Sequence, residues 1–310
     1  MLPTHRSFRR LALITCYPPD PSFMPKQLTA AALQRIAGLE AFPQPSIIPL
    51  QTPVVLMHGF GMGATFRRGG HLHEEAMYLR SRGIRAYAPN VAAYNTVEAR
   101  SSMWLRRIAP ILDETRSERI VIIAHSMGGL DARHLIYHEG LHEVVDVLIT
   151  VSTPHRGSSI ANLVLEQPSV VRKWMMEMAD WLGTHALEDA TANALQAITQ
   201  LTPAYLRNSF NPETPDHPDV DYWSFAGHAG KGTDITLDPV LRFLNAYLYE
   251  REGPNDGFVS VDSARWGTFC GTVDADHARQ VGFQSKLGGA NFDSNGFYAT
   301  IAERLHNAES

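Results

Sequence analysis

Short, uninterrupted apolar runs alternate with helix-like patterns between about residues 53 and 152. Four runs are expected to be strands: VVLM (54–57), IRAYAP (84–89), RIVIIA (119–124) and VVDVLITVS (144–152). Helices are expected over HLHEEAMYLRSRG (71–83), over 96–116 and from Met127 onward. Strands that are apolar throughout and separated by helices are typical of a parallel sheet covered on both faces. The pattern therefore predicts an α/β fold with a mostly parallel central sheet.

The alternation stops after about residue 157. Residues 158–215 show helical patterns and lead into the Pro-rich segment NPETPDHPDV, after which DYWSFAG (221–227) indicates a strand and 238–250 a helix. Residues 1–50 contain one expected helix, around KQLTAAALQRIAGLE, and are predicted to be an N-terminal extension. We expect one domain over residues 51–310, with 158–215 inserted as a helical lid over the catalytic edge of the sheet.

Composition narrows the class of protein. Of 310 residues, 44% are hydrophobic and 19% are charged, which is enough apolar material for a sizeable core. The net charge of −5 leaves no basic surplus for a phosphate backbone, so nucleic acid is not an expected partner. No run approaches the roughly 18 apolar residues of a membrane span. The run LALITC, near the N-terminus, is shorter than the apolar core of a secretory signal, which favours the cytoplasm over secretion.

The segment RIVIIAHSMGGLDARHLIY places Ser126 between a predicted strand and a predicted helix. A serine in the pattern G-x-S-x-G at such a position marks a nucleophile elbow, whose strained turn requires small flanking residues. Here Ala124 and Gly128 take the two small positions. The turn would expose the serine oxygen and direct the N–H of Met127 toward a developing oxyanion. A serine that merely caps the helix is the alternative interpretation.

A second oxyanion donor is expected from the loop after an earlier strand. The segment VVLMHGFGMG supplies one, the N–H of Phe60. His58, Ser126 and Ser152 each follow a predicted strand, so they should share one edge of the sheet.

A nucleophilic serine needs a base and an orienting carboxylate, which follow it in the order acid, then His. His277, in the loop-like TVDADHARQVG, is preferred as the base over His306 in a polar C-terminal helix. Asp256, in a tight Asn-Asp-Gly turn, is the preferred acid. The other candidate acids are Asp238, Asp262, Asp274 and Asp276.

Together these segments resemble a bacterial triacylglycerol lipase of the α/β-hydrolase fold. The similar segments cover most of residues 52–280 in the family's order: VVLMHGFGMG, AHSMGGLDARHL, VLITVSTPHRGSS, ALQAITQLTPAYLRNSF, YWSFAG, LDPVL and PNDGFVS. The resemblance implies Ser126 as nucleophile, Asp256 as acid and His277 as base. It also implies Phe60 and Met127 as backbone oxyanion donors.

One departure concerns calcium, which many secreted lipases of this kind hold near the catalytic histidine with two aspartates. Asp238 in LDPVL matches one of the two, but the other position is taken by Arg279, and a cation cannot ligate calcium. We expect no cofactor here, and an Asp238–Arg279 ion pair joining the same two loops.

The segment PSVVRKWMMEMADWLG, within the insertion, carries apolar residues at helical spacing. They are Val170, Val171, Trp174, Met175, Met178, Trp181 and Leu182. On a lid, such a face covers an apolar acyl site when closed and meets lipid when open. A core-facing helix would show the same pattern. We take Trp174, Met175, Met178 and Trp181 as candidate substrate contacts.

The sequence thus predicts a serine ester hydrolase, in the first place a lipase that cleaves acylglycerols or other carboxylic esters through an acyl-enzyme on Ser126. A carboxylesterase, a phospholipase or a polyester depolymerase would use the same triad. A catalytically silent hydrolase-fold binding protein is the alternative outside enzymes, although it would have no reason to keep all three residues. The expected partner is a lipid or ester substrate, with a lipid–water interface as one setting; the sequence does not indicate an oligomeric state.

Overall fold

The computed structural model describes residues 37–38, 46–60, 70–167, 191–283 and 292–309. The chain divides into two units, Met1–Pro45 and Ser46–Ser310. In the first unit only residues 37–38 are described, and they form a turn. The rest of the expected helix over 26–40 lies outside the described residues.

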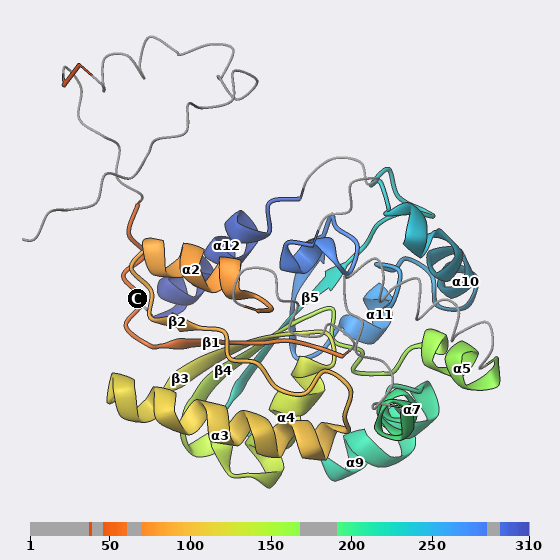
Figure 1. Cartoon of the computed structure of the whole chain (residues 1–310), viewed down its shortest axis with the longest axis horizontal. Coiled ribbons are helices and arrows are strands. Elements are labelled where there is room, and N and C mark those ends of the chain that lie inside the picture. The colour runs from red at the N-terminus through yellow and green to blue at the C-terminus, as the bar shows by residue number, and fades with distance from the viewer. Residues whose placement is uncertain (1–36, 39–45, 61–69, 168–190, 284–291, 310) are drawn as a thin grey trace, which may run out of the picture. The chain divides into compact units, whose positions relative to one another are not determined.

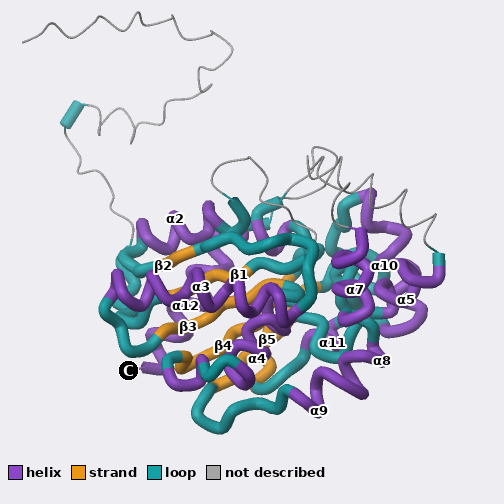
Figure 2. Tube along the Cα trace, turned by 60° about the horizontal axis from the view of Figure 1, so that its bottom comes forward, coloured by secondary structure: helices purple, strands orange, loops and turns teal. Residues whose placement is uncertain are grey.

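The second unit is built on a six-stranded sheet in which all neighbouring strands run parallel. The strand order is β2-β1-β3-β4-β5-β6. Figures 1 and 2 label β1 to β5. The strands are β1 (Val54–Met57), β2 (Ala86–Tyr87), β3 (Ile120–His125), β4 (Val145–Val151), β5 (Asp221–Gly227) and β6 (Thr268–Val273). Every residue of β1 and β3 is buried, which is why their sequences are apolar without alternation. The predicted α/β fold with a parallel sheet is confirmed.

Helices cover both faces of this sheet. The helices α2 (His73–Ser81) and α12 (Ser294–Glu309) lie against one face, and α3 (Val97–Thr115) and α4 (Gly128–His138) lie against the other (Figure 1). Together they bury two apolar clusters, one on each side of the sheet.

Successive residues of β1 contribute to opposite clusters. Val54 and Leu56 pack with α2 and α12, whereas Val55 and Met57 pack with α3 and α4. This is the period-two alternation of a strand that is buried on both sides.

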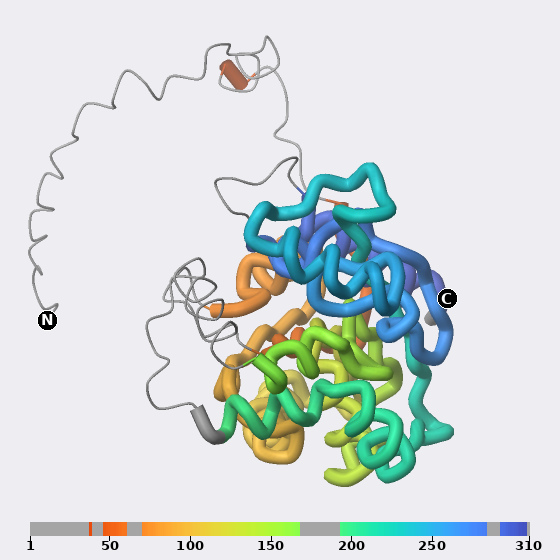
Figure 3. Tube along the Cα trace, turned by 90° about the vertical axis from the view of Figure 1, so that its right-hand side faces the viewer, coloured from red at the N-terminus to blue at the C-terminus, as the bar shows by residue number. Residues whose placement is uncertain are grey.

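Additional short helices lie beyond the carboxyl ends of the strands, on the right in Figure 1 and facing the viewer in Figure 3. They are α5 (Ser159–Glu166), α7 (Thr191–Gln200), α8 (Pro203–Tyr205), the π-helical turn η3 (Leu206–Phe210), α9 (Asn211–Glu213), α10 (Arg242–Glu252) and α11 (Val261–Ala264). The helical content expected over 158–215 is present in its described parts, 158–167 and 191–215.

Two sheet-edge elements differ from the sequence prediction. The strand expected over 84–89 is reduced to the two residues of β2, and β6 had no strand signal in the sequence. Strand β6 lies at the sheet edge and stays partly exposed along most of its length, so it needs no continuous apolar run. Within the part of the chain that the structure describes, no helix is both long and apolar enough to cross a membrane.

Candidate active site

Ser126 stands at the sharp turn between β3 and α4. Its φ of 57° lies in the left-handed region, which serine rarely adopts and which marks a strained turn. Two neighbours hold the turn: the Ser126 N–H donates to the carbonyl of Val151 at 2.9 Å, and the Thr153 hydroxyl donates to the Ser126 carbonyl at 2.7 Å. At Gly128, a Cβ atom would lie 2.8 Å from the carbonyl oxygen of His58, so the second small position requires glycine for space.

The three side chains predicted to form a triad are linked by hydrogen bonds. Nε2 of His277 lies 2.9 Å from Oγ of Ser126, and Nδ1 of His277 lies 2.7 Å from Oδ2 of Asp256. An ionised carboxylate can only accept, so in the neutral ring Nδ1 carries the hydrogen and Nε2 is free to accept the serine O–H. This is the arrangement in which an imidazole can act as general base toward a hydroxyl.

The Asn-Asp-Gly turn fixes the carboxylate of Asp256. Its Oδ1 atom accepts the N–H groups of Phe258 and Val259 at 3.0 and 2.8 Å, and the Asp256 carbonyl accepts the N–H of His277 at 3.0 Å. Burial raises the pKa of Asp256, but the charge of His277 and the donated hydrogen bonds outweigh it, and the pKa is lowered. The acid therefore remains ionised although it is fully buried.

The other candidate residues are engaged elsewhere. Asp274 pairs with His228, and Asp276 pairs with Arg279. The Asp238 carboxylate caps the turn that begins at Pro239. Asp262 is exposed at the start of α11, and His306 lies in α12.

The two predicted oxyanion donors flank Ser126. Met127 is the N-cap residue of α4, and Phe60 ends the described part of the loop after β1. Among the described residues, neither backbone N–H donates to a protein acceptor. A Cβ atom on Gly59 would lie 2.5 Å from Cβ of Ser126, so the loop that carries Phe60 runs directly against the serine. Both amides are therefore without a competing acceptor among the described residues, close to Ser126.

A buried ion pair supports the loop that carries Phe60. The sequence analysis did not predict this pair. Arg100 donates from Nε to Asp131 Oδ2 at 2.8 Å and from Nη2 to the carbonyl of His58 at 2.7 Å. Trp104 donates to the same Asp131 oxygen at 3.0 Å. The signal was present, because Arg100 falls on the buried stripe of α3 that also carries Val97 and Trp104.

A second histidine packs against His277. The rings of His125 and His277 lie 4.5 Å apart between centroids, and His125 is fully buried. Burial, together with the neighbouring charge of His277, lowers the pKa of His125 well below its usual range. His125 is therefore neutral and lines the site beside His277, and of the two rings it is His277 that is hydrogen-bonded to Ser126.

The predicted Asp238–Arg279 ion pair is not the one that forms. Arg279 pairs with Asp276, at 3.3 Å between Nε and Oδ2, and it donates from Nη1 to the carbonyl of Thr236. The Asp238 N–H donates to the same Asp276 oxygen at 3.2 Å. Asp276 lies in the loop just before His277 and is thus nearer to Arg279 than Asp238 is. A guanidinium already neutralises this carboxylate, so the residues present do not fit a calcium ion.

The side chains of the two predicted oxyanion donors pack in an apolar cluster. Phe60 and Met127 belong to a cluster with side chains of α7 and η3. Its other members are Val97, Leu130, Ala197, Leu201, Tyr205, Leu206 and Phe210. The candidate lid contacts Trp174, Met175, Met178 and Trp181 lie outside the described residues.

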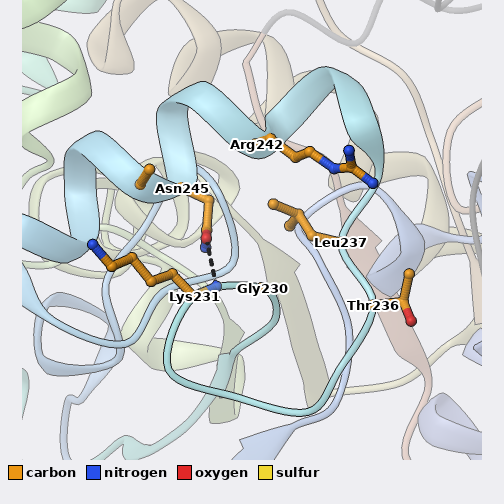
Figure 4. Close-up of a pocket in the computed structure, with 7 residues that line it drawn as sticks. Gly230, Lys231, Thr236, Leu237, Arg242 and Asn245 are labelled. Atoms are coloured by element: carbon orange, nitrogen blue, oxygen red, sulfur yellow. Dashed lines mark hydrogen bonds between the residues drawn. The ribbon is translucent and has the colours of Figure 1, made fainter.

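A separate pocket of about 360 Å³ lies between the loop 230–237 and the start of α10 (Figure 4). Lys231 and Arg242 line it, and the N–H of Lys231 donates to the side chain of Asn245 at 2.8 Å. None of the triad residues lines this pocket.

Comparisons with known proteins agree with this fold. The PGAP1-like alpha/beta domain family matches residues 89–200. Triacylglycerol lipase 2 of Saccharomyces cerevisiae is 30% identical over 219 residues, which span 68% of this chain and 61% of the yeast protein. A triacylglycerol lipase of Vibrio cholerae is 28% identical over 69% of this chain and 74% of its own length.

Among solved structures, the mature lipase of Bacillus licheniformis is 25% identical, with a TM-score of 0.57 over 76% of this chain and 89% of that chain. A lipase of Staphylococcus hyicus shares the fold, with a TM-score of 0.62 at 18% identity, over 87% of this chain and 99% of its own. The chain is therefore similar in sequence to triacylglycerol lipases, and it has the α/β-hydrolase fold of the solved lipase structures.

Proposed function

We propose that the protein is a serine ester hydrolase of the lipase type, with Ser126 as nucleophile, His277 as general base and Asp256 as the orienting acid. The observation that carries this proposal is the continuous hydrogen-bonded line from Ser126 Oγ through the imidazole to Asp256 Oδ2. The lipase relatives support a lipid or ester as the substrate.

The reaction runs in two halves. His277 takes the Ser126 proton as Oγ attacks the ester carbonyl, and the N–H groups of Phe60 and Met127 stabilise the oxyanion. The tetrahedral intermediate collapses, the alcohol leaves with the proton from His277, and the acyl group stays on Ser126. Water, activated by the same imidazole, then attacks the acyl-enzyme and releases the carboxylic acid.

The partly exposed members of the apolar cluster, Phe60, Leu201 and Tyr205, favour an ester with a hydrocarbon acyl chain. An apolar wall beside the oxyanion donors can bury such a chain, whereas a charged acyl group would lose its hydration there. A triacylglycerol lipase and a carboxylesterase both satisfy this requirement, and they differ in the length of chain that they accept.

Hydrolysis of p-nitrophenyl esters tests the proposal. The wild type should hydrolyse them, and Ser126→Ala should lose measurable turnover while keeping the same melting temperature. Ser117→Ala, a serine in a turn between α3 and β3, is the matched control and should keep full activity. A faster rate on long chains than on short ones, raised further by an oil interface, would identify a lipase; the reverse order would identify a carboxylesterase. Equal hydrolysis by Ser126→Ala would contradict the proposal.

The Arg279–Asp276 pair supports the further proposal that the loop of His277 is held without a metal. The Arg279 side chain reaches both Asp276 and the carbonyl of Thr236, and so spans the two loops that a bound cation would otherwise join.

A further inference from the structure

Among the residues that the structure describes, the carboxylate of Asp256 has one side-chain donor besides the base, and that donor is Gln280. Nε2 of Gln280 lies 3.0 Å from Oδ2 of Asp256, the same oxygen that accepts the imidazole N–H of His277. Gln280 belongs to the short 3₁₀ turn η5 (Arg279–Val281) and is fully buried. It lies three residues after His277, so one loop supplies both partners of this oxygen.

The amide of Gln280 can take only one orientation. If its NH₂ and carbonyl were exchanged, two acceptor oxygens would face each other at 3.0 Å with no hydrogen between them. In the orientation present, Nε2 also donates to the carbonyl of Ala275 at 3.3 Å. The amide therefore ties Asp256 to the segment that leads into His277.

Space for this amide exists because residue 227 is glycine. A Cβ atom on Gly227, at the carboxyl end of β5, would lie 1.9 Å from Nε2 of Gln280 and 2.9 Å from Cβ of Asp256. The φ of Gly227 is not in the left-handed region, so the backbone conformation does not demand glycine there. Glycine is required at position 227 because any side chain there would clash with Gln280 and Asp256.

We propose that Gln280 is a positioning residue of the triad, which holds Oδ2 of Asp256 in line with the imidazole N–H of His277. This inference rests on the proposed function. Oδ1 accepts two backbone N–H groups and Oδ2 accepts two side-chain N–H groups, so the carboxylate cannot turn without losing hydrogen bonds. Without Gln280, Oδ2 is held by the base alone, and the base must move during the reaction.

The test compares Gln280→Met and Gln280→Glu with the wild type in the pH dependence of kcat/KM. Methionine keeps the length of the side chain but has no N–H, and we expect kcat to fall about tenfold with little change in KM. Loss of the donor leaves more of the carboxylate charge facing the imidazole, which favours the protonated ring, so the acid limb should move to higher pH. In Gln280→Glu, repulsion between the two buried carboxyls should keep one proton on the pair, so that a hydrogen bond to Oδ2 is retained and the acid limb stays nearer to that of the wild type than in Gln280→Met.

Gln200→Met is the matched control. Gln200 is also a buried glutamine whose Nε2 donates to a carboxylate, that of Glu98, at 2.8 Å, and that carboxylate is not in the triad. Its variant should lose stability without moving the acid limb. Gly227→Ala reaches the same amide from β5 and should reproduce the Gln280→Met profile, which keeps the test open if one variant does not fold.

Labelling with a fluorophosphonate distinguishes a failure of the proposed serine mechanism from a failure of the proposed role of Gln280. If the wild type is not labelled at Ser126, the serine mechanism itself is wrong. If the wild type is labelled and active, but folded Gln280→Met keeps its kcat and its acid limb, then Gln280 does not position the acid.

Discussion

Nε2 of His277 lies 2.9 Å from Oγ of Ser126, although 151 positions separate the two residues in the chain. The parallel sheet explains this approach. Ser126 follows β3, and the Asp256 turn and the His277 loop follow β5 and β6, so all three reach the same edge of the sheet.

Asp256→Asn should lower kcat by up to about 10⁴, because an amide can no longer hold the imidazole in the tautomer that accepts the serine proton. Steady-state kinetics on a p-nitrophenyl ester measures the effect. Asp274→Asn is the control, since this aspartate is exposed and pairs with His228 away from the triad; its kcat should stay near that of the wild type. Near-wild-type turnover by Asp256→Asn would remove Asp256 from the triad.

Arg100→Met should destabilise the protein by about 3–5 kcal/mol, because the buried carboxylate of Asp131 loses its counter-ion. Urea unfolding measures the loss. The double variant Arg100→Met, Asp131→Leu should recover part of this stability. We expect kcat to be lower than that of the wild type in both the single and the double variant. In both, the His58 carbonyl, which precedes the proposed oxyanion loop, lacks its Arg100 donor. A double variant with full activity would show that Arg100 only balances the charge of Asp131.

Arg279→Ala should lower the melting temperature, because Asp276 is then buried without a counter-ion and the Thr236 carbonyl loses its donor. EDTA should change neither the melting temperature nor the activity of the wild type. Lys231→Ala, which removes an exposed cation on the neighbouring loop, is the control and should melt close to the wild type. Stabilisation of the wild type by calcium would overturn the proposal that this loop is held without a metal.

His71 should make the protein less stable in mild acid. Burial, aided by the charge of Arg100, lowers the pKa of His71 from 6.5 to about 4. Between pH 6.5 and pH 4, the His71 imidazole is therefore protonated in the unfolded chain but neutral in the folded protein. The folded state is stable relative to the unfolded state above pH 6.5, and it loses stability as the pH falls toward 4. The free energy of unfolding of the wild type, relative to His71→Gln, should drop by about 2 kcal/mol between pH 7 and pH 5. An equal difference in unfolding free energy between the wild type and His71→Gln at the two pH values would contradict this.

The central strands of the fold and the residues of the proposed triad could be predicted from the sequence, because each is marked by a short pattern of neighbouring residues. Continuous apolar runs define the buried strands, and the residues around Ser126 and Asp256 specify tight turns. Strand β6 was not predicted, because a strand at the sheet edge can be partly exposed and then needs no continuous apolar run.

The supporting contacts could not be predicted in the same way, because they depend on which side chains meet after folding. Arg100 and Asp131 lie on different helices. The amide of Gln280 has no sequence signature, and only the close packing at Gly227 makes its position evident. Arg279 was expected to pair with Asp238, but Asp276 lies closer to it along the chain and in space.

The most direct measurement of the central claim is the intact mass of the protein after treatment with a fluorophosphonate, followed by peptide mapping. The account predicts one adduct per chain, located on Ser126, with no labelling of Ser126→Ala and much slower labelling of His277→Ala. A folded wild type that takes no adduct, or an adduct that persists in Ser126→Ala, would contradict it.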